Sequence, residues 1–345
     1  MNIKEGVLLR TYTTFRIGGP ADFFVSVRTV EELKDALVFA RNKKLPYLVV
    51  GGGSNMLFPD EGYRGLIIHM QMKGIYFEEF GTHVLARASS GEVWDTFVDI
   101  TIKNGLWGLE NLSLIPGSVG ATPVQNVGAY GVEVSDVIKD VEVFDTKTES
   151  IVNLSNEACA FGYRSSIFKT DGGRRYIVTA VTYVLSKVAK PNVAYKDLKK
   201  KFSMRKSIPT AQEIRRAVIS IRRGKFPDLK KCGTAGSFFR SPIITKEKYE
   251  QLLVSYPGLP SFPIGRTHVK VVLSWFLDKI LHLKGVREGD VGTHSNHALV
   301  IVNHKGASAH AVQKFAHSIV TKVFDTTGVI ILPEVMIIEN KKIKV

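Results

Sequence analysis

The spacing of apolar residues predicts a helix followed by a buried strand near the start of the chain. Thr29 and Glu32 have the spacing of a helix-capping box, and apolar residues recur at helical intervals over 33–44. The run 47–50 is short, apolar and partly β-branched, and Gly51 follows it, which is typical of a buried strand. These patterns predict a β-α-β opening.

Similar patterns along the rest of the chain predict strands and helices that do not alternate strictly. The predicted strands cover 66–69, 83–88, 141–144, 176–185, 298–302 and 329–332, and the predicted helices cover 94–104, 210–221, 246–254, 272–281 and 309–324. Strict strand–helix alternation would favour one doubly wound sheet. Its absence predicts an α+β fold with several lobes, and the pattern breaks at Arg222, where we expect a domain boundary.

Length and composition indicate a globular protein. The 345 residues, 44% of them hydrophobic and 23% charged, correspond to two or three domains and exclude a disordered or low-complexity chain. No apolar run is long enough for a membrane span, and the first 20 residues lack a signal-peptide core. Two cysteines, Cys159 and Cys232, cannot form a disulfide framework, so we expect a cytoplasmic protein.

The formal charge of +15 is concentrated in one segment. Residues 190–231 contain 14 Lys and Arg and only three acids. Such a segment attracts anions, and nucleic acid, an anionic membrane surface and a phosphorylated small molecule all fit it. A solvated basic face without a partner fits it equally well.

Two glycine-rich stretches are the strongest local signals for a ligand. The first follows the predicted strand 47–50 and comprises Gly51, Gly52, Gly53, Ser54 and Asn55. Glycines that adopt positive φ expose backbone N–H groups that can bind phosphate, although such a run is also typical of a tight turn. Neither the GxGxxG nor the GxxxxGK[ST] pattern is present, so any phosphate would be held between strands.

The second stretch combines small residues, hydroxyls and amides, which suits a flat polar heterocycle or a diphosphate. Its candidate ligand-binding residues are Pro116, Gly117, Ser118, Gly120, Ala121, Gln125, Asn126 and Gly128. A long structural turn is the alternative. The two stretches together favour one large ligand that contacts both.

Six blocks in one order, at 14–21, 51–62, 110–131, 161–169, 236–239 and 333–335, resemble the UDP-N-acetylenolpyruvoylglucosamine reductase family. This resemblance implies a two-lobed FAD-binding domain of the vanillyl-alcohol-oxidase/PCMH type and a C-terminal α+β domain that binds substrate. The implied divisions are 1–70 for the first lobe, 71–223 for the second lobe, joined by 335–345, and 224–334 for the substrate-binding domain. We expect a cytoplasmic monomer that binds no nucleic acid and does not insert into a membrane.

The resemblance also implies a reaction. NADPH reduces the bound FAD, and the flavin N5 then passes a hydride to the enolpyruvyl ether of the UDP-sugar, which yields UDP-N-acetylmuramate. By the family pattern Arg164 stabilises the enolate, Glu334 is the acid that assists it, and Ser237 donates the proton that quenches it. A planar, permanently charged guanidinium suits the stabilising role. Without the family blocks, all three would be ordinary surface or turn residues.

Five further residues are implied to contact substrate: Tyr163, Tyr195, Lys225, Ser241 and His297. Tyr195 matches the loop tyrosine that covers bound substrate in the longer family subtype. Ser241 and His297 depart from the pattern, since Asn is common at the first position and Gln at the second. These departures predict altered contacts to the nucleotide sugar.

Two rival classes remain open from the sequence. One is another FAD enzyme of the same type that oxidises an alcohol. The other is a nucleic-acid-binding protein that uses residues 190–231, although no RNP-like or helix-turn-helix motif supports it. Six of the nine histidines lie between His282 and His317, but without HExxH or a ligand set, so we predict no metal site.

Overall fold

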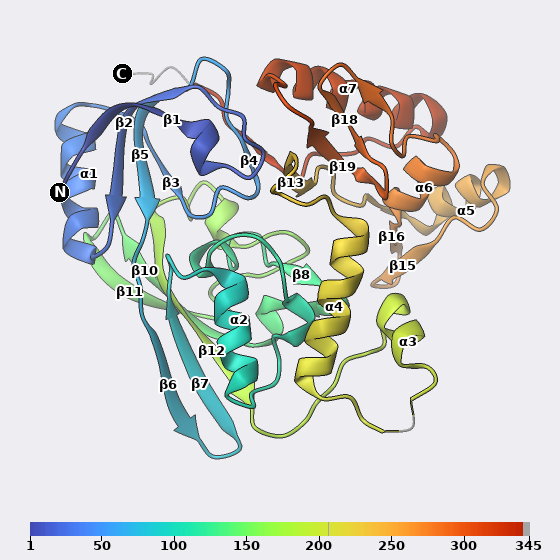
Figure 1. The fold of residues 1–345 in the computed structure, drawn as a ribbon, viewed down its shortest axis with the longest axis horizontal. Coiled ribbons are helices and arrows are strands. Elements are labelled where there is room, and N and C mark those ends of the chain that lie inside the picture. The colour runs from blue at the N-terminus through green and yellow to red at the C-terminus, as the bar shows by residue number, and fades with distance from the viewer. Residues whose placement is uncertain (206, 341–345) are drawn as a thin grey trace. The chain divides into compact units, whose positions relative to one another are not determined.

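The computed structural model describes residues 1–205 and 207–340 (Figure 1). It divides into two compact units, and the chain passes between them several times. The first unit comprises Met1–Val7, Ala21–Gly52 and Arg64–Arg222, and the second comprises Leu8–Pro20, Gly53–Tyr63 and the chain from Arg223 onward. The three-part division expected from the sequence stays a prediction.

The first unit begins with a small sheet covered by one helix. Its strand order is β1 (Lys4–Leu8), β2 (Pro20–Val27), β5 (Tyr63–Met70) and β3 (Tyr47–Val50), with β3 parallel to β5. Helix α1 (Val30–Asn42) packs Leu33, Ala36 and Ala40 onto the sheet. The Thr29 hydroxyl caps this helix by accepting from Glu32 N, as predicted, whereas the Glu32 carboxylate accepts from Arg28 N instead of Thr29 N.

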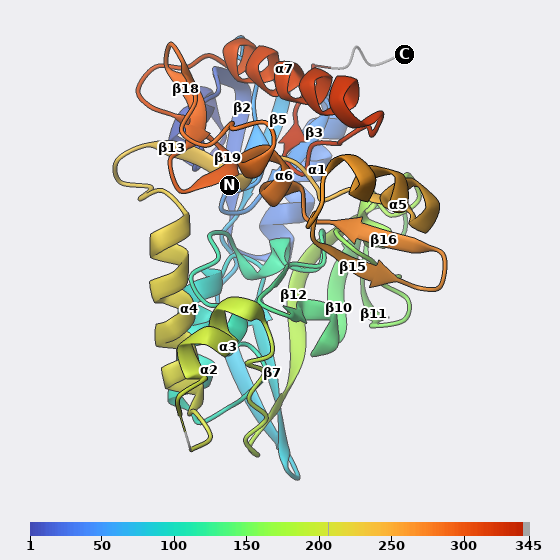
Figure 2. The same cartoon turned by 90° about the vertical axis from the view of Figure 1, so that its right-hand side faces the viewer.

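A five-stranded antiparallel sheet makes up most of the first unit. Its order is β11 (Ser150–Ser155), β10 (Ile138–Asp145), β12 (Tyr176–Ser186), β7 (His83–Ser89) and β6 (Ile75–Phe80). Helix α2 (Trp94–Lys103) buries Trp94 and Phe97 against Tyr183 of β12. Helix α3 (Lys196–Phe202) lies beside α4 (Ala211–Lys225), as Figure 2 shows.

Short elements connect these parts of the first unit. They are the 3-10 helices η2 (Glu110–Leu112), η3 (Val119–Ala121), η4 (Val134–Asp136) and η5 (Ile167–Lys169), and the paired strands β8 (Gly128–Ala129) and β9 (Val132–Glu133). Most of the second glycine-rich stretch is therefore tight turns and 3-10 helix.

The second unit contains three small sheets with helices packed on them. Their orders are β13 (Gly233–Ser237), β19 (His297–Asn303), β18 (Val291–His294), β17 (Arg287–Glu288); then β14 (Ile243–Thr245), β16 (His268–Val271), β15 (Ser261–Ile264); and β4 (Met56–Leu57) parallel to β20 (Met336–Ile337). The helices are η1 (Leu9–Tyr12), α5 (Lys246–Ser255), α6 (Leu273–Lys279) and α7 (Ala309–Thr327). Helix α7 buries the predicted apolar face, which includes Val312, Phe315 and Ile319.

Two predicted elements differ from the structure. The segment 329–332 pairs with no strand, so the predicted strand there is wrong. The segment is a short apolar, partly β-branched run that follows Gly328, and this run produced the expectation. Helix α4 runs to Lys225 instead of ending near Arg222.

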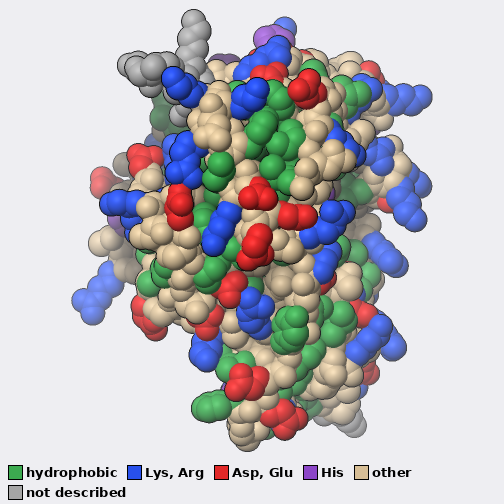
Figure 3. Space-filling view, turned by 90° about the vertical axis from the view of Figure 1, so that its left-hand side faces the viewer, with side chains coloured by type: hydrophobic (Ala, Val, Ile, Leu, Met, Phe, Trp, Pro, Cys, Tyr) green, Lys and Arg blue, Asp and Glu red, His purple; other side chains and the backbone are tan. Residues whose placement is uncertain are grey.

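Surface charge and helix length both bear on the kind of partner or environment the protein can have. The face on the side of α1 has Lys and Arg interspersed with Asp and Glu (Figure 3), so it holds no block of one sign. None of the helices in the described part of the chain has the length and apolar character that a bilayer crossing requires.

Candidate functional site

The first glycine loop lies against the second one in the first unit. A Cβ placed on Gly51 would overlap the Ser118 hydroxyl, and one on Gly52 would lie 2.9 Å from Gly117 Cα. The two loops therefore meet backbone to backbone, with no space for a side chain between them. Of the three glycines in the first loop only Gly53 has a positive φ, 57°, so the expectation that successive glycines adopt this conformation is wrong.

The remainder of the first loop belongs to the second unit. A Cβ on Gly53 would overlap the Tyr12 carbonyl oxygen. Asn55 Nδ2 donates to Glu334 O at 3.1 Å, and β4 begins at the next residue. The loop thus changes from one unit to the other at Gly53.

The start of the second glycine-rich stretch is held against the turn after β7. Gly120 N donates to Ser90 O at 2.9 Å, and a Cβ on Gly120 would lie 2.5 Å from Ser90 Cβ. Trp94 N donates to Gly117 O at 3.1 Å. Glycine is therefore required at Gly120 by close packing.

Asn126 connects this stretch to the turn that carries Arg164. Its buried side chain donates to Glu133 Oε2 at 2.8 Å and to Gly162 O at 3.2 Å, and accepts from Ser135 N at 3.1 Å. Both amide hydrogens and the amide oxygen are thus bound within the protein. Asn126 therefore shapes the loop, and its contact with a cofactor stays a prediction.

The Arg164 side chain is held in a defined orientation. Its guanidinium donates from Nη2 to Gly128 O at 2.8 Å and from Nη1 to Asn126 O at 3.4 Å, and it lies 5.5 Å from the centre of the Tyr163 ring. Arg164 has φ 53°, which costs a non-glycine residue about 1–2 kcal/mol. Strain of this kind, together with fixed donors, is typical of a functional site.

Tyr195 lies at the start of α3 in the same unit. Its ring packs edge-on against Tyr130, with ring centres 5.3 Å apart. Burial raises the pKa of Tyr130 to about 12, although the neighbouring Arg222 opposes the shift. Arg222 Nε donates to Leu114 O at 3.1 Å, and its side chain also hydrogen-bonds Tyr130. Arg222 thus holds Tyr130, and Tyr130 in turn packs against the exposed Tyr195 ring.

In the second unit, Ser237 and Glu334 are brought to neighbouring backbone positions. Ser237 ends β13 next to a register shift, and Phe238 N donates to Leu299 O at 2.8 Å. Glu334 N donates to Phe238 O at 2.7 Å. Two predicted residues almost a hundred positions apart in sequence therefore lie on adjoining segments.

Lys225 and His297 also come together in the second unit. The His297 ring stacks on Phe226 with centres 5.4 Å apart, and Asn296 Nδ2 donates to Gly224 O at 2.9 Å. Burial, with Lys225 as a further cause, lowers the pKa of His297 to about 4. Ser241 is half-buried between β13 and β14, and no hydrogen bond among the described residues joins its side chain to these groups.

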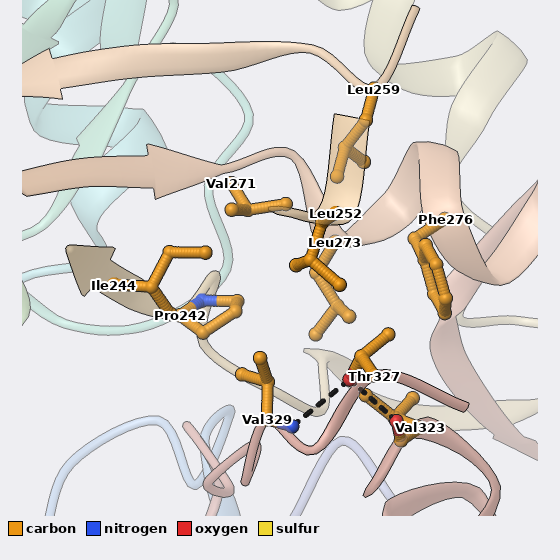
Figure 4. Close-up of a pocket in the computed structure, with 10 residues that line it drawn as sticks. All are labelled: Pro242, Ile244, Leu252, Leu259, Val271, Leu273, Phe276, Val323, Thr327 and Val329. Atoms are coloured by element: carbon orange, nitrogen blue, oxygen red, sulfur yellow. Dashed lines mark hydrogen bonds between the residues drawn. The ribbon is translucent and has the colours of Figure 1, made fainter. Parts of the chain in front are cut away.

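An apolar pocket in the second unit is not a candidate for this site. Helices α5, α6 and α7 and the sheet of β14, β15 and β16 surround it (Figure 4). Its hydroxyl, Thr327, donates to Val323 O and accepts from Val329 N. The pocket therefore offers no polar group for an anionic ligand.

Comparisons with known proteins identify the family. Residues 21–155 match the FAD binding domain family, and residues 227–338 match the family described as UDP-N-acetylenolpyruvoylglucosamine reductase, C-terminal domain. The reductase of Neisseria gonorrhoeae is 42% identical over 92% of both chains, and that of Flavobacterium johnsoniae is 39% identical over 98% of this chain and all of the other. The chain belongs to the UDP-N-acetylenolpyruvoylglucosamine reductase family. The α+β architecture and the FAD-binding domain expected from the sequence are thereby confirmed.

A solved member of the reductase family has the same fold. The UDP-N-acetylenolpyruvylglucosamine reductase from Thermus caldophilus aligns with a TM-score of 0.68 and 26% identity, and the match covers 98% of this chain and all of the other. The likeness therefore extends over both units and not over the FAD-binding part alone.

The glycine loops of this reductase-family chain fit a flavin dinucleotide. The close approach of Gly52 to Gly117 leaves only backbone at the junction, and backbone N–H groups are suitable donors to a diphosphate. The two glycine-rich stretches also contain the polar residues Ser54, Asn55 and Gln125. We assign the FAD to these loops as a proposal.

Several residues that shape the site could not be found from local sequence signals. Asn111 donates to Tyr130 O and Asn192 O, and Arg215, although it lies in the basic segment, is buried and paired with Asp95 at 2.6 Å. Arg222 is the third such residue. Arg215 and Arg222 of the basic segment therefore hold the fold, whereas the lysines at 196 and 199–201 are exposed.

The lowered pKa of His297 leads us to predict a measurable pH dependence of the free energy of unfolding. An unfolded histidine binds a proton near pH 6.5 and folded His297 only near pH 4, so protons favour the unfolded state between these values. Between pH 7 and pH 5 the free energy of unfolding of the native protein should fall by about 2 kcal/mol more than that of His297→Gln. Urea denaturation at both pH values with equal added FAD measures this, and an identical pH dependence in both proteins would refute the assignment.

Proposed function

We propose that this protein reduces the enolpyruvyl ether of UDP-N-acetylglucosamine to the lactyl ether of UDP-N-acetylmuramate, in peptidoglycan precursor synthesis. The supporting observation is that an FAD-binding domain and the reductase-specific C-terminal domain follow one another in a chain that spans 92–100% of its relatives' length. FAD is the bound cofactor and NADPH the reductant. We place the reaction in the cytoplasm and predict a monomer.

Bound FAD would supply the redox chemistry by accepting a hydride from NADPH and passing a hydride from N5 to the terminal vinyl carbon of the substrate. The electron pair of the vinyl bond then moves toward the carboxylate as an enolate, and a proton must reach the α-carbon to complete the lactyl ether. The protein has to stabilise negative charge and deliver that proton.

Arg164 is the residue we assign to the enolate charge. Two carbonyl oxygens, of Gly128 and Asn126, already fix its guanidinium, so it need not reorganise when charge develops. Glu334 is assigned to the same carboxylate as an acid. Its backbone is fixed by Phe238 O and Asn55 Nδ2.

Ser237 is the residue we assign to proton delivery. A hydroxyl is a weak acid, so it needs a fixed position and a partner that stabilises the resulting alkoxide. The hydrogen bond of Phe238 N to Leu299 O fixes the strand end that carries it. Lys225, Tyr163, Tyr195, Ser241 and His297 are proposed to bind the substrate.

The decisive experiment follows the two half-reactions without oxygen. Purified protein should show flavin absorbance, NADPH should bleach it, and the enolpyruvyl nucleotide should restore it with formation of UDP-N-acetylmuramate. A colourless protein would refute the cofactor assignment. If oxygen reoxidises the reduced flavin and the enolpyruvyl nucleotide does not, the substrate assignment is refuted.

Tyr195→Phe should impair the second half-reaction only. The Tyr130 contact holds the ring, so the substitution removes the hydroxyl and leaves the ring in place. Loss of one hydrogen bond to a charged substrate should raise the substrate concentration for half-maximal reoxidation about tenfold. Stopped-flow absorbance measures both halves. Tyr76→Phe, on exposed β6, is the matched control, and an unchanged Tyr195→Phe would argue against the covering role.

A further inference from the structure

A lysine-rich surface is built on α3. Leu198 and Phe202 pack with Ile214 and Val218 of α4, which fixes the inner side of the short helix. Lys196, Lys199, Lys200 and Lys201 are exposed. The helix is therefore held to the protein by its apolar residues and presents its lysines to solvent.

The charges near α3 leave these lysines largely uncompensated. Arg205 is paired with Glu213 at 2.8 Å, and Lys201 donates to Ser220 Oγ at 3.2 Å. Asp197 is the acid within α3 itself. No ion pair between described residues engages Lys196, Lys199 or Lys200, in contrast to the mixed charges on the α1 face of Figure 3.

Two large apolar side chains are exposed in the segment that follows α3 along the chain. Met204, two residues after α3, is 95% exposed, and Ile208 is 71% exposed. Such exposure of apolar side chains beside a cluster of lysines is typical of peripheral membrane contacts, where the lysines meet anionic headgroups and the apolar groups enter the interface. A nucleic acid would leave Met204 and Ile208 in water, and the exposed aromatic ring that precedes α3, Tyr195, is already packed edge-on against Tyr130.

We propose that the α3 patch, defined as Lys196, Lys199, Lys200, Lys201, Met204 and Ile208, binds the protein reversibly to an anionic lipid surface. Headgroup phosphates attract the lysines, and the two apolar side chains enter the headgroup boundary. The excess of basic residues in 190–231 would then serve membrane binding as well as attraction of an anionic substrate. This proposal does not depend on the assigned reaction.

The test is cosedimentation of the purified flavoprotein with vesicles at about 0.1 M salt. Vesicles of equal phosphatidylglycerol and phosphatidylcholine should bind the protein at least tenfold better than pure phosphatidylcholine vesicles. Lys196→Gln/Lys199→Gln/Lys200→Gln should lower this binding at least tenfold. Met204→Ser/Ile208→Ser should lower it severalfold without changing the net charge.

A matched variant separates a local patch from overall charge. Lys43→Gln/Lys44→Gln/Lys322→Gln removes the same three charges from exposed positions elsewhere, and it should bind the anionic vesicles like the native protein. Circular dichroism and flavin content should show that every variant is folded.

Three results would overturn the proposal. The first is equal binding to both kinds of vesicle, or binding to neither. The second is an equal loss in the control variant, which would indicate overall charge. The third is native vesicle binding by Met204→Ser/Ile208→Ser together with displacement of the vesicles by a single-stranded oligonucleotide, which would indicate a nucleic-acid site.

Discussion

Ser237→Ala should leave reduction of the bound flavin by NADPH close to the native rate and slow its reoxidation by the enolpyruvyl nucleotide by about a hundredfold or more. Hydride arrival from NADPH needs no proton donor at the substrate, whereas the lactyl product needs a proton at its α-carbon. The substitution removes only the hydroxyl, because backbone bonds of β13 and Phe238 hold the strand end in place. Stopped-flow flavin absorbance measures each half-reaction separately.

A cysteine at the same position tests the chemistry further. Ser237→Cys retains an ionisable hydrogen and should recover part of the lost rate, with native flavin content. A Ser237→Ala protein that reoxidises at the native rate, or that fails equally in both halves, would show that Ser237 is a structural residue at the end of β13.

Gly52→Val should lose its FAD. The first side-chain carbon would lie 2.9 Å from Gly117 Cα and 3.2 Å from Gly117 C, so the second glycine loop would have to move away. The two methyl groups of valine increase the displacement, and we expect FAD affinity to fall by about a hundredfold or more. The reason is close packing between loops, since the φ of Gly52 is not in the left-handed region.

The matched control for this variant is Gly172→Val. A Cβ on Gly172 would meet no atom within 4 Å, and its φ is likewise outside the left-handed region. The ratio of flavin to protein after gel filtration measures the effect, with circular dichroism to show folding. Stoichiometric FAD in a folded Gly52→Val protein would contradict the assignment of the loops to the cofactor.

Local sequence patterns predicted those elements whose signals lie within one segment. The Thr29 cap, the strand over Tyr47–Val50 and the apolar face of α7 all follow from residues a few positions apart. The segment 329–332 shows the limit of such patterns. It is an apolar, partly β-branched run, but no neighbouring strand completes a ladder with it, and a strand exists only with a partner.

The residue types of the site were also readable from the sequence. Glycine-rich turns after a strand indicated backbone binding of phosphate, and the six ordered blocks indicated the family and so the FAD. These inferences need only residue identity and order. They do not depend on which segments meet in the folded chain.

Only the tertiary structure decided which groups hold one another. It placed Gly52 against Gly117, bound the Asn126 side chain within the loop and fixed Arg164 on the carbonyls of Gly128 and Asn126. It also buried the His297 ring and lowered its pKa to about 4. The contacts of Gly52 with Gly117 and of Arg164 with Gly128 and Asn126 join residues tens of positions apart. Burial depends on everything packed around a group, so no local pattern in the sequence encodes these features.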